Sequence, residues 1–161
     1  TDRETVNKTE RMKVTTCLNP LHTALAVYGC MLGYTLICDE MKDATLVKLV
    51  KRLGYVEGLP VVVDPGILSP KAFIDEVVEQ RLPNPFMPDS PQRIATDTSQ
   101  KVGIRFGETI KSYVEKGKDL HELAGHRRLA ALSARRGRRR KGHRDFRRPD
   151  EGRIAGAAGG H

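Results

Sequence analysis

Hydrophobic positions before residue 126 recur at helical spacing, and capping residues separate the runs. Residues 44–55 carry an apolar stripe opposite lysine and arginine, and Asp43 stands before them as an N-cap. Ser69-Pro70 and Ser90-Pro91 begin two further helices, because serine caps a helix and proline favours its first position. Another helix covers 101–116. This pattern predicts an all-α fold class.

The longest apolar run, from Leu21 to Cys38, is hydrophobic on nearly every helix face, and residues 20–38 contain no Asp, Glu, Lys or Arg. Asn19 as an N-cap, followed by Pro20, predicts where this helix begins. A membrane span is one interpretation of such a run. Polar residues such as His22 dilute it, however, and amphipathic helices follow it. We therefore expect a buried central helix and no membrane association.

One short segment departs from the helical pattern. Val61-Val62-Val63 is an apolar run that ends at Asp64-Pro65-Gly66, which is a turn signal. A strand and an extended loop are equally compatible with this run. We expect a compact, mainly helical domain with a short extended segment at 60–64.

The net charge of +8 is concentrated at the C-terminal end. Residues 126–161 carry eleven Arg and one Lys against three acidic residues, whereas residues 1–125 carry 16 basic and 17 acidic residues. Arg, Gly, Ala and Pro make up 24 of the last 36 residues, and apolar periodicity stops after Leu132. We therefore divide the chain into a domain over 1–125 and an Arg-rich tail over 126–161.

Three interpretations of this tail are open. A disordered basic arm would bind nucleic acid or an anionic lipid surface, because arginine neutralises phosphate groups. A merely solvated extension would have no partner. A reading frame shifted near Gly125 would also produce this composition, because these residue types have G+C-rich codons. Nucleic acid is therefore a partner only if the tail is genuine.

Signatures of several common sites are absent from the sequence. It contains no G-x-G-x-x-G after a strand and no G-x-x-x-x-G-K-[ST], so it shows no loop for binding nucleotide phosphates. The Cys and His residues lack the spacing of a zinc site. Three cysteines at irregular spacing argue against a disulfide framework and fit a reducing, cytoplasmic compartment. Since the chain begins at Thr1 within a charged run, we interpret it as a piece of a longer protein.

Candidate chemistry lies at the start of the central helix. Asn19 and His22 are three residues apart, so they lie on nearly the same helix face, about 60° apart around its axis. An amide and an imidazole can together hold a carbonyl or hydroxyl oxygen. Partial desolvation of the nearby Lys13 ammonium would lower its pKa from about 10.4 and suit it to proton transfer. This set suits interconversion of an alcohol and a ketone, although a capping Asn, a core His and a surface Lys have the same spacing.

Two stretches carry a resemblance to a known family. They are Arg11–Tyr34, with the sequence RMKVTTCLNPLHTALAVYGCMLGY, and Arg93–Lys101, with the sequence RIATDTSQK. Together with Val63-Asp64-Pro65-Gly66 they resemble the polyol-specific long-chain (mannitol) dehydrogenase family, and most of all its mannonate/fructuronate branch. The resemblance covers about residues 1–125.

The resemblance implies a fold, an activity and a set of site residues. The domain would be the all-helical C-terminal domain of an oxidoreductase, similar to that of 6-phosphogluconate dehydrogenase. The enzyme would use NAD or NADP and no metal to interconvert a sugar acid or polyol and its ketone. Lys13 would be the general acid/base, and Asn19 and His22 would polarise the reacting oxygen. Arg93 and Lys101 would bind the substrate, since they suit a hydroxyl-rich chain that ends in a carboxylate and arginine offers a bidentate fork. The alternative is that the two residues form only a surface ion pair and a helix-end cation.

This sequence departs from the family pattern in three places. Lys13 stands six residues before Asn19, whereas the family lysine stands five residues before it, so either a bulge absorbs the extra residue or Lys13 is misassigned. The N-terminal Rossmann-type cofactor domain is missing. The apolar final helix expected after 120–125 is replaced by the Arg-rich tail. We therefore expect the isolated chain to be inactive, with only part of an active site.

Overall fold

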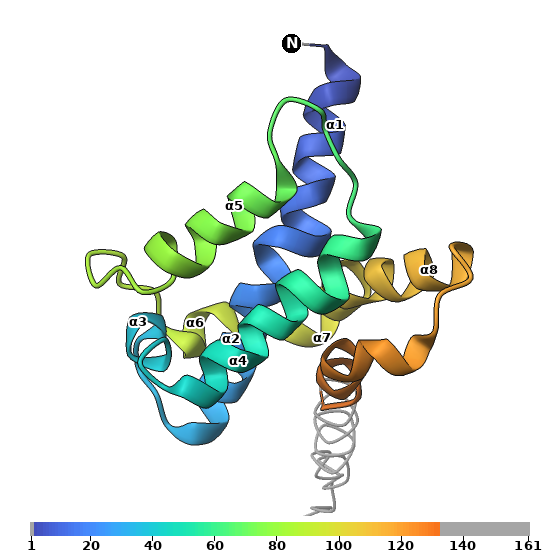
Figure 1. Ribbon diagram of the computed structural model, residues 1–161. Helices are drawn as coiled ribbons and strands as arrows, with labels where there is room; N and C mark the ends of the chain where they lie inside the picture. The colour runs from blue at the N-terminus through green and yellow to red at the C-terminus, as the bar shows by residue number, and fades with distance from the viewer. Residues whose placement is uncertain (1, 133–161) are drawn as a thin grey trace, which may run out of the picture.

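A computed structural model describes residues 2–132 of the chain, and these residues form helices and connecting loops with no strand among them (Figure 1). The predicted all-α fold class is therefore confirmed. The Arg-rich tail beyond residue 132 lies outside the described residues. The α-helices are α1 (Arg3–Met12), α2 (Asn19–Leu32), α3 (Ile37–Glu40), α4 (Ala44–Lys51), α5 (Pro70–Glu76), α6 (Pro91–Ile94), α7 (Thr98–Val102) and α8 (Glu108–Glu115).

Several of these helices continue directly into π-helical turns. In such a turn the backbone N–H bonds to the carbonyl five residues earlier, as Leu18 N does to Lys13 O at 3.1 Å and Leu82 N to Val77 O at 2.9 Å. The predicted helices over 44–55 and 101–116 are thus confirmed as composite helices. The π-helical turns are η1 (Lys13–Cys17) after α1, η2 (Arg52–Gly58) after α4, η4 (Val77–Arg81) after α5 and η5 (Gly103–Gly107) between α7 and α8.

Three of the predicted N-caps form as expected. The Asp43 side chain accepts hydrogen bonds from two backbone N–H groups of α4, at 2.7 and 3.3 Å. Ser69 and Ser90 each accept one N–H in the first turns of α5 and α6. Asn19 was wrongly predicted as a cap. Because η1 leads almost directly into α2, Asn19 is itself the first residue of this helix and its side chain caps nothing.

Helix α2 is the buried centre of the domain. Leu21, Ala24 and Leu25 are fully buried, and α4, η2, η5 and α6 all pack against this helix (Figure 1). It ends at Gly33, whose φ of 86° favours glycine. It is therefore shorter than the run to Cys38 suggested, and α3 follows as a separate turn. No helix within residues 2–132 has both the length and the apolar character needed to cross a membrane.

The valine run at 61–63 is not a strand. Leu59–Val61 forms a 3-10 turn, η3, and Val62 begins the following loop with an extended backbone (φ −59°, ψ 149°). Of the two alternatives for the extended segment at 60–64, the structure shows the loop, preceded by the 3-10 turn.

The domain extends past the boundary that composition placed after Gly125. A 3-10 turn, η6 (Leu120–Leu123), leads into a helix over 124–132. His126 and Leu129 on that helix are buried, and Leu129 belongs to the main hydrophobic core. Residues 126–132 therefore pack as part of the domain. The boundary drawn from composition missed them, because two inward-facing side chains among arginines barely change the average composition.

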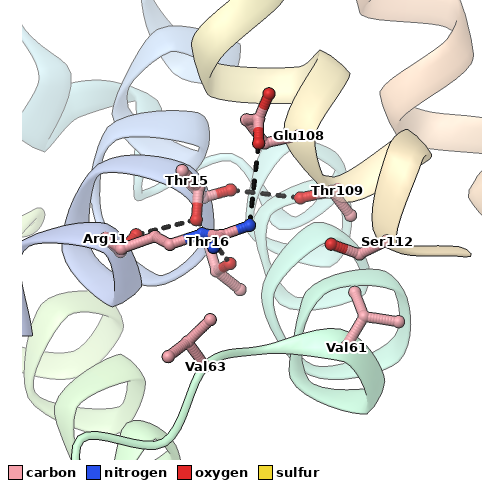
Figure 2. Close-up of a pocket in the computed structure, with 8 residues that line it drawn as sticks. All are labelled: Arg11, Thr15, Thr16, Val61, Val63, Glu108, Thr109 and Ser112. Atoms are coloured by element: carbon pink, nitrogen blue, oxygen red, sulfur yellow. Dashed lines mark hydrogen bonds and ion pairs between the residues drawn. The ribbon is translucent and has the colours of Figure 1, made fainter. Parts of the chain in front are cut away.

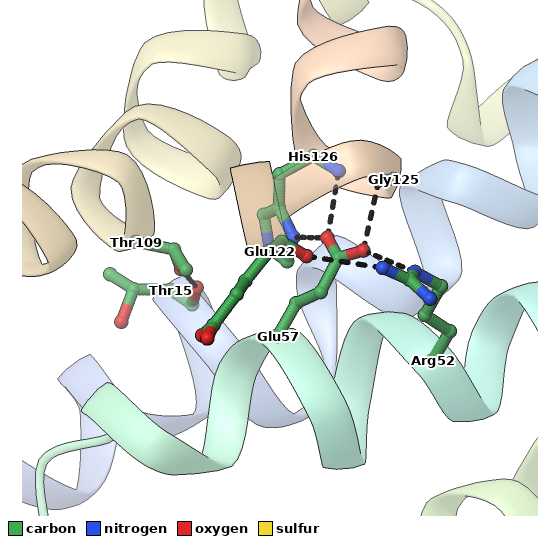
Figure 3. A network of polar contacts seen from close by, with 7 residues as sticks. All are labelled: Thr15, Arg52, Glu57, Thr109, Glu122, Gly125 and His126. Atoms are coloured by element: carbon green, nitrogen blue, oxygen red, sulfur yellow. Dashed lines mark hydrogen bonds and ion pairs between the residues drawn. The ribbon is translucent and has the colours of Figure 1, made fainter. Parts of the chain in front are cut away.

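The buried Glu57 carboxylate anchors this last helix (Figure 3). It accepts hydrogen bonds from the backbone N–H groups of Gly125 (2.9 Å) and His126 (3.0 Å), and it lies 2.7 Å from His126 Nδ1. Arg52 Nε donates at 2.8 Å to Oε1, the oxygen that also accepts from Gly125. Burial raises the pKa of Glu57, but these hydrogen bonds outweigh burial and leave the pKa below its ordinary value. Glu57 thus caps a helix some seventy residues further along the chain.

Replacing Glu57 by alanine should lower the free energy of unfolding by about 3–5 kcal/mol, because it leaves the buried donors of His126 and Gly125 without an acceptor and removes the ion-pair partner of Arg52. Urea denaturation followed by circular dichroism measures this loss. Glu76→Ala, at an exposed position on α5, is the matched control and should change little. Equal effects of the two substitutions would show that the Glu57 network does not stabilise the last helix.

A second buried acid, Glu40, has no such partners. Neither of its carboxyl oxygens makes a hydrogen bond among the described residues. Burial raises the pKa of Glu40 to about 8, so the side chain is largely protonated at neutral pH. A Cβ added at Gly29 would lie 2.1 Å from Glu40 Oε1. Glycine at this position therefore lets α2 pack closely against the carboxyl group of α3.

The contribution of Glu40 to stability should fall as the pH rises from about 4.5 to about 8. Folded Glu40 keeps its proton over this range and the unfolded side chain loses it, so deprotonation progressively favours unfolding. Glu40→Gln should flatten this dependence in thermal melts across the same pH range. Glu79→Gln, at an exposed position, should retain it. An unaltered slope in the Glu40 variant would contradict the assignment.

Candidate functional site

The first turn of α2 places two of the predicted site residues side by side. Asn19 and His22 are half-buried, and the Asn19 side chain makes no hydrogen bond among residues 2–132. His22 Nε2 lies 3.3 Å from Asp89 Oδ2. The alignment is not that of a hydrogen bond, so this buried nitrogen also lacks a bonded partner in the described structure. Both side chains therefore have hydrogen-bonding groups that lack a partner among the described residues.

Asp89 connects His22 to a third predicted site residue. Its Oδ1 accepts a hydrogen bond from Arg93 Nη2 at 2.5 Å, while its Oδ2 faces the His22 imidazole. The backbone holds this loop in place, because Ile37 N donates to Asp89 O at 3.0 Å. Gln92 Nε2 also donates to Tyr34 O at 2.8 Å and ties α6 to the α2–α3 loop. His22 and Arg93, 71 residues apart, thus share one carboxylate.

Guanidinium groups from three different elements surround His22. Burial lowers the pKa of His22, Asp89 opposes this effect, and Arg81, Arg105 and Arg93 lower the pKa further. The net shift is downward, so the imidazole is neutral at neutral pH. A neutral imidazole can donate or accept a hydrogen bond at a substrate oxygen.

The ammonium group of Lys13 lies in a different part of the structure. Its Nζ is 4.0 Å from Glu10 Oε1 and 5.9 Å from the centre of the Phe73 ring on α5. Arg81, which lines a small pocket with His22, is eight residues further along the same composite helix α5–η4. Eight residues correspond to about 12 Å of helical rise. Lys13 and His22 therefore contact separate parts of one helix and do not meet at one atom in this structure.

A π-helical turn, η1, occupies the segment before Asn19. Lys13 is its first residue, and the bond from Leu18 N to Lys13 O closes a turn that holds one more residue than an α-turn. A bulge is one of the two explanations for the departure from the family spacing, and the role of Lys13 stays a prediction.

Lys101 faces its own segment rather than His22. Its Nζ donates to the backbone carbonyl of Thr96 at 3.1 Å. Asp97, between them, adopts a left-handed backbone (φ 58°), which aspartate tolerates better than most residues. The ammonium group of Lys101 thereby lies near the turn that follows α6 and its Arg93.

Another pocket contains none of the predicted site residues. Arg11 and Glu108 form an ion pair of 3.7 Å across it, and Thr109 Oγ1 donates to Thr15 O at 3.1 Å (Figure 2). Its main polar groups are thus committed to one another, and we do not regard it as the functional site. Among residues 2–132, no three His, Cys, Asp or Glu side chains are placed to hold a metal ion.

Sequence reasoning missed Asp89, Arg81 and Arg105. Asp89 stands four residues before Arg93, so a helical ion pair between them was readable from the sequence. No local signal indicated that Arg105 would reach the central helix, where it donates to the Thr23 hydroxyl next to His22.

The comparisons with known proteins agree with this fold. The model of the mannitol dehydrogenase C-terminal domain family matches residues 5–134, and the chain belongs to this family. The predicted family is thus confirmed. The match extends past Gly125, and the buried side chains of His126 and Leu129 likewise place residues beyond 125 in the domain.

Individual relatives are much longer than this chain. A D-mannonate oxidoreductase of Thermotoga maritima is 70% identical over 116 residues, which are 72% of this chain and 21% of that protein. A polyol:NADP oxidoreductase of Gluconobacter oxydans is 27% identical over 107 residues, 66% of this chain and 22% of the relative. A crystal structure of D-sorbitol dehydrogenase in substrate-free form superposes with a TM-score of 0.70 at 27% identity, over 81% of this chain and 26% of that chain. The chain thus spans about a fifth to a quarter of each relative.

The His22 imidazole should titrate below its ordinary pKa of 6.5, because burial and three guanidinium groups disfavour its charged form. Nuclear magnetic resonance of the histidine ring nitrogens over a pH series measures this midpoint. Asp89→Asn should lower it further by removing a favourable charge, and Arg93→Gln should raise it. Asp64→Asn, at an exposed position in another loop, is the control. Midpoints unaffected by Asp89→Asn would disprove the coupling.

Proposed function

We propose that this chain is the substrate-binding and proton-transferring domain of an NAD- or NADP-dependent dehydrogenase. The enzyme would interconvert the alcohol of a sugar acid or polyol and its ketone, as in the mannonate/fructuronate branch. The observation that carries this proposal is the pair Asn19 and His22, whose amide and imidazole keep uncommitted hydrogen-bonding groups beside Arg93. The family membership and the names of the relatives support it.

In this proposal Asn19 and His22 bind the reacting oxygen and stabilise the negative charge that develops on it. The neutral state of His22 fits a hydrogen-bonding role. Lys13 takes the proton from the substrate hydroxyl during oxidation and returns it during reduction. To do so, Lys13 leaves its ion pair with Glu10. The two groups are 4.0 Å apart, and the Glu10 side chain is largely exposed. The long side chain of Lys13 then turns toward Asn19.

Arg93 and Lys101 would bind the rest of a hydroxyl-rich substrate. Arg93 is mostly exposed and offers donors beyond the one bound to Asp89, since a guanidinium carries five N–H groups. Lys101 contributes an ammonium from the adjacent turn. The two residues thus bring hydrogen-bond donors to α6 and the turn that follows it.

The residues of this chain do not by themselves fit a dinucleotide. The sequence has no glycine-rich loop for binding nucleotide phosphates. When bound, the nicotinamide supplies or accepts the hydride. We propose that a Rossmann-type domain outside this sequence holds it, with residues 2–132 as the C-terminal domain.

A chimera tests this proposal. Residues 5–134 replace the matching region of the Thermotoga maritima D-mannonate oxidoreductase, and the absorbance of the reduced nicotinamide reports oxidation of D-mannonate. The chimera should be active, and Lys13→Ala should lower its kcat by at least about a hundredfold, because general acid–base catalysis is lost. Lys48→Ala, at an exposed position on α4, is the control.

Two results would contradict the proposal. An inactive but folded chimera would argue against the dehydrogenase function, and an unchanged kcat in the Lys13 variant would remove this residue from proton transfer. The isolated 161-residue chain should show no turnover, since it holds no dinucleotide site. Turnover by that chain alone would refute the division of the active site between two domains.

A further inference from the structure

Arg105 is a half-buried arginine with no carboxylate partner among residues 2–132. Its Nη1 donates to the hydroxyl of Thr23, a fully buried residue on α2 next to His22. Burial lowers the pKa of Arg105, which reflects the cost of holding a charge away from water. A guanidinium carries five N–H donors in a planar fork, so most of its binding capacity remains unused.

The other two arginines near His22, Arg93 and Arg81, are more exposed than Arg105. Arg93 already shares the Asp89 carboxylate at 2.5 Å, and its side chain is 70% exposed. Arg81 lies on the exposed side of η4. Asp89 is therefore the one carboxylate that balances three guanidinium groups around His22 in the described structure. The cluster keeps a net positive charge, and Arg105 is its most buried guanidinium without a counter-charge.

Resting on the proposed function, we propose that Arg105 binds the carboxylate of a sugar acid and so makes the site prefer a sugar acid to the corresponding neutral polyol. The planar fork of a guanidinium matches the two oxygens of a carboxylate. Partial burial strengthens such a pair relative to one in water. Asn19 and His22 hold the reacting oxygen, so a carboxylate at the far end of the substrate needs a separate receptor such as Arg105.

Position on the fold supports this assignment. Arg105 belongs to η5, which packs against α2, the helix that carries Asn19 and His22. Its contact with Thr23 fixes the guanidinium beside the first turn of α2. Thr23 has a neutral hydroxyl, so the contact orients the guanidinium without neutralising it. Arg105 is thus held at the site with its charge available to a ligand.

The test measures binding of two matched sugars to the full 161-residue chain. D-mannonate and D-mannitol differ in charge at one end and are titrated while the backbone amide shifts near His22 are followed by nuclear magnetic resonance. We expect D-mannonate to bind more tightly. Arg105→Gln should weaken D-mannonate binding by at least about tenfold, because a charge-assisted bidentate pair is lost. The affinity for D-mannitol should change by less than about twofold.

Two further variants complete the comparison. Arg105→Lys keeps the charge and loses the fork, so it should weaken D-mannonate binding by less than Arg105→Gln does. It also serves if the glutamine variant fails to fold. Arg3→Gln, at an exposed position on α1, is the matched control and should leave both affinities unchanged. All variants keep residues 133–161, so any sugar binding by the Arg-rich tail contributes equally to the wild-type chain and to every variant.

The proposal would be overturned if Arg105→Gln weakened the binding of both sugars equally or changed the binding of neither. A wild-type chain that does not prefer D-mannonate would overturn it as well. Neither result bears on the dehydrogenase function, which the activity of the chimera tests independently. A D-mannonate preference that disappears with Arg105→Gln and partly persists with Arg105→Lys would support Arg105 as the carboxylate receptor.

Discussion

Burial of α2 on almost every side is the constraint on which this domain depends. A helix without a single charged residue is stable in water only when other elements cover it, and here α4, η2, η5 and α6 provide that cover. The cover is incomplete at both ends of the helix, since Asn19 and His22 in the first turn are half-buried and Met31 and Leu32 in the last turn are exposed. The candidate site therefore lies where the core ends, and a rigid, packed helix fixes the positions of its two central side chains.

Three acidic side chains show how this fold treats negative charge. Glu57 is fully buried but receives enough donors to remain ionised, and it fastens the final helix to η2. Glu40 is buried with no hydrogen-bond partner among the described residues and keeps its proton instead. Asp89 lies at the edge of the core and divides its oxygens between Arg93 and His22. The number of available donors, rather than burial alone, decides which acid is charged.

The local charge of the site differs from the average charge of the domain. Residues 1–125 are almost neutral, with 16 basic and 17 acidic side chains. Folding nevertheless brings Arg81, Arg93 and Arg105 around one imidazole with Asp89 as their nearby counter-charge. These arginines come from η4, α6 and η5, which are separate elements of the chain. A positive site for an anionic ligand can thus form in a neutral domain, because packing sorts charges that are mixed along the sequence.

The sequence by itself determined the helical fold and the helix starts at Asp43, Ser69 and Ser90, because caps and amphipathic stripes depend on residues only a few positions apart. It also indicated Asn19 and His22 as a pair on one face. Only the tertiary structure decided that Asp89 joins His22 to Arg93, that Arg105 reaches Thr23, and that the last helix packs through His126. The contacts of His22 with Asp89, Arg105 with Thr23 and His126 with Glu57 join residues 67, 82 and 69 positions apart, so no local spacing encodes them, whereas the Asp89–Arg93 pair is local.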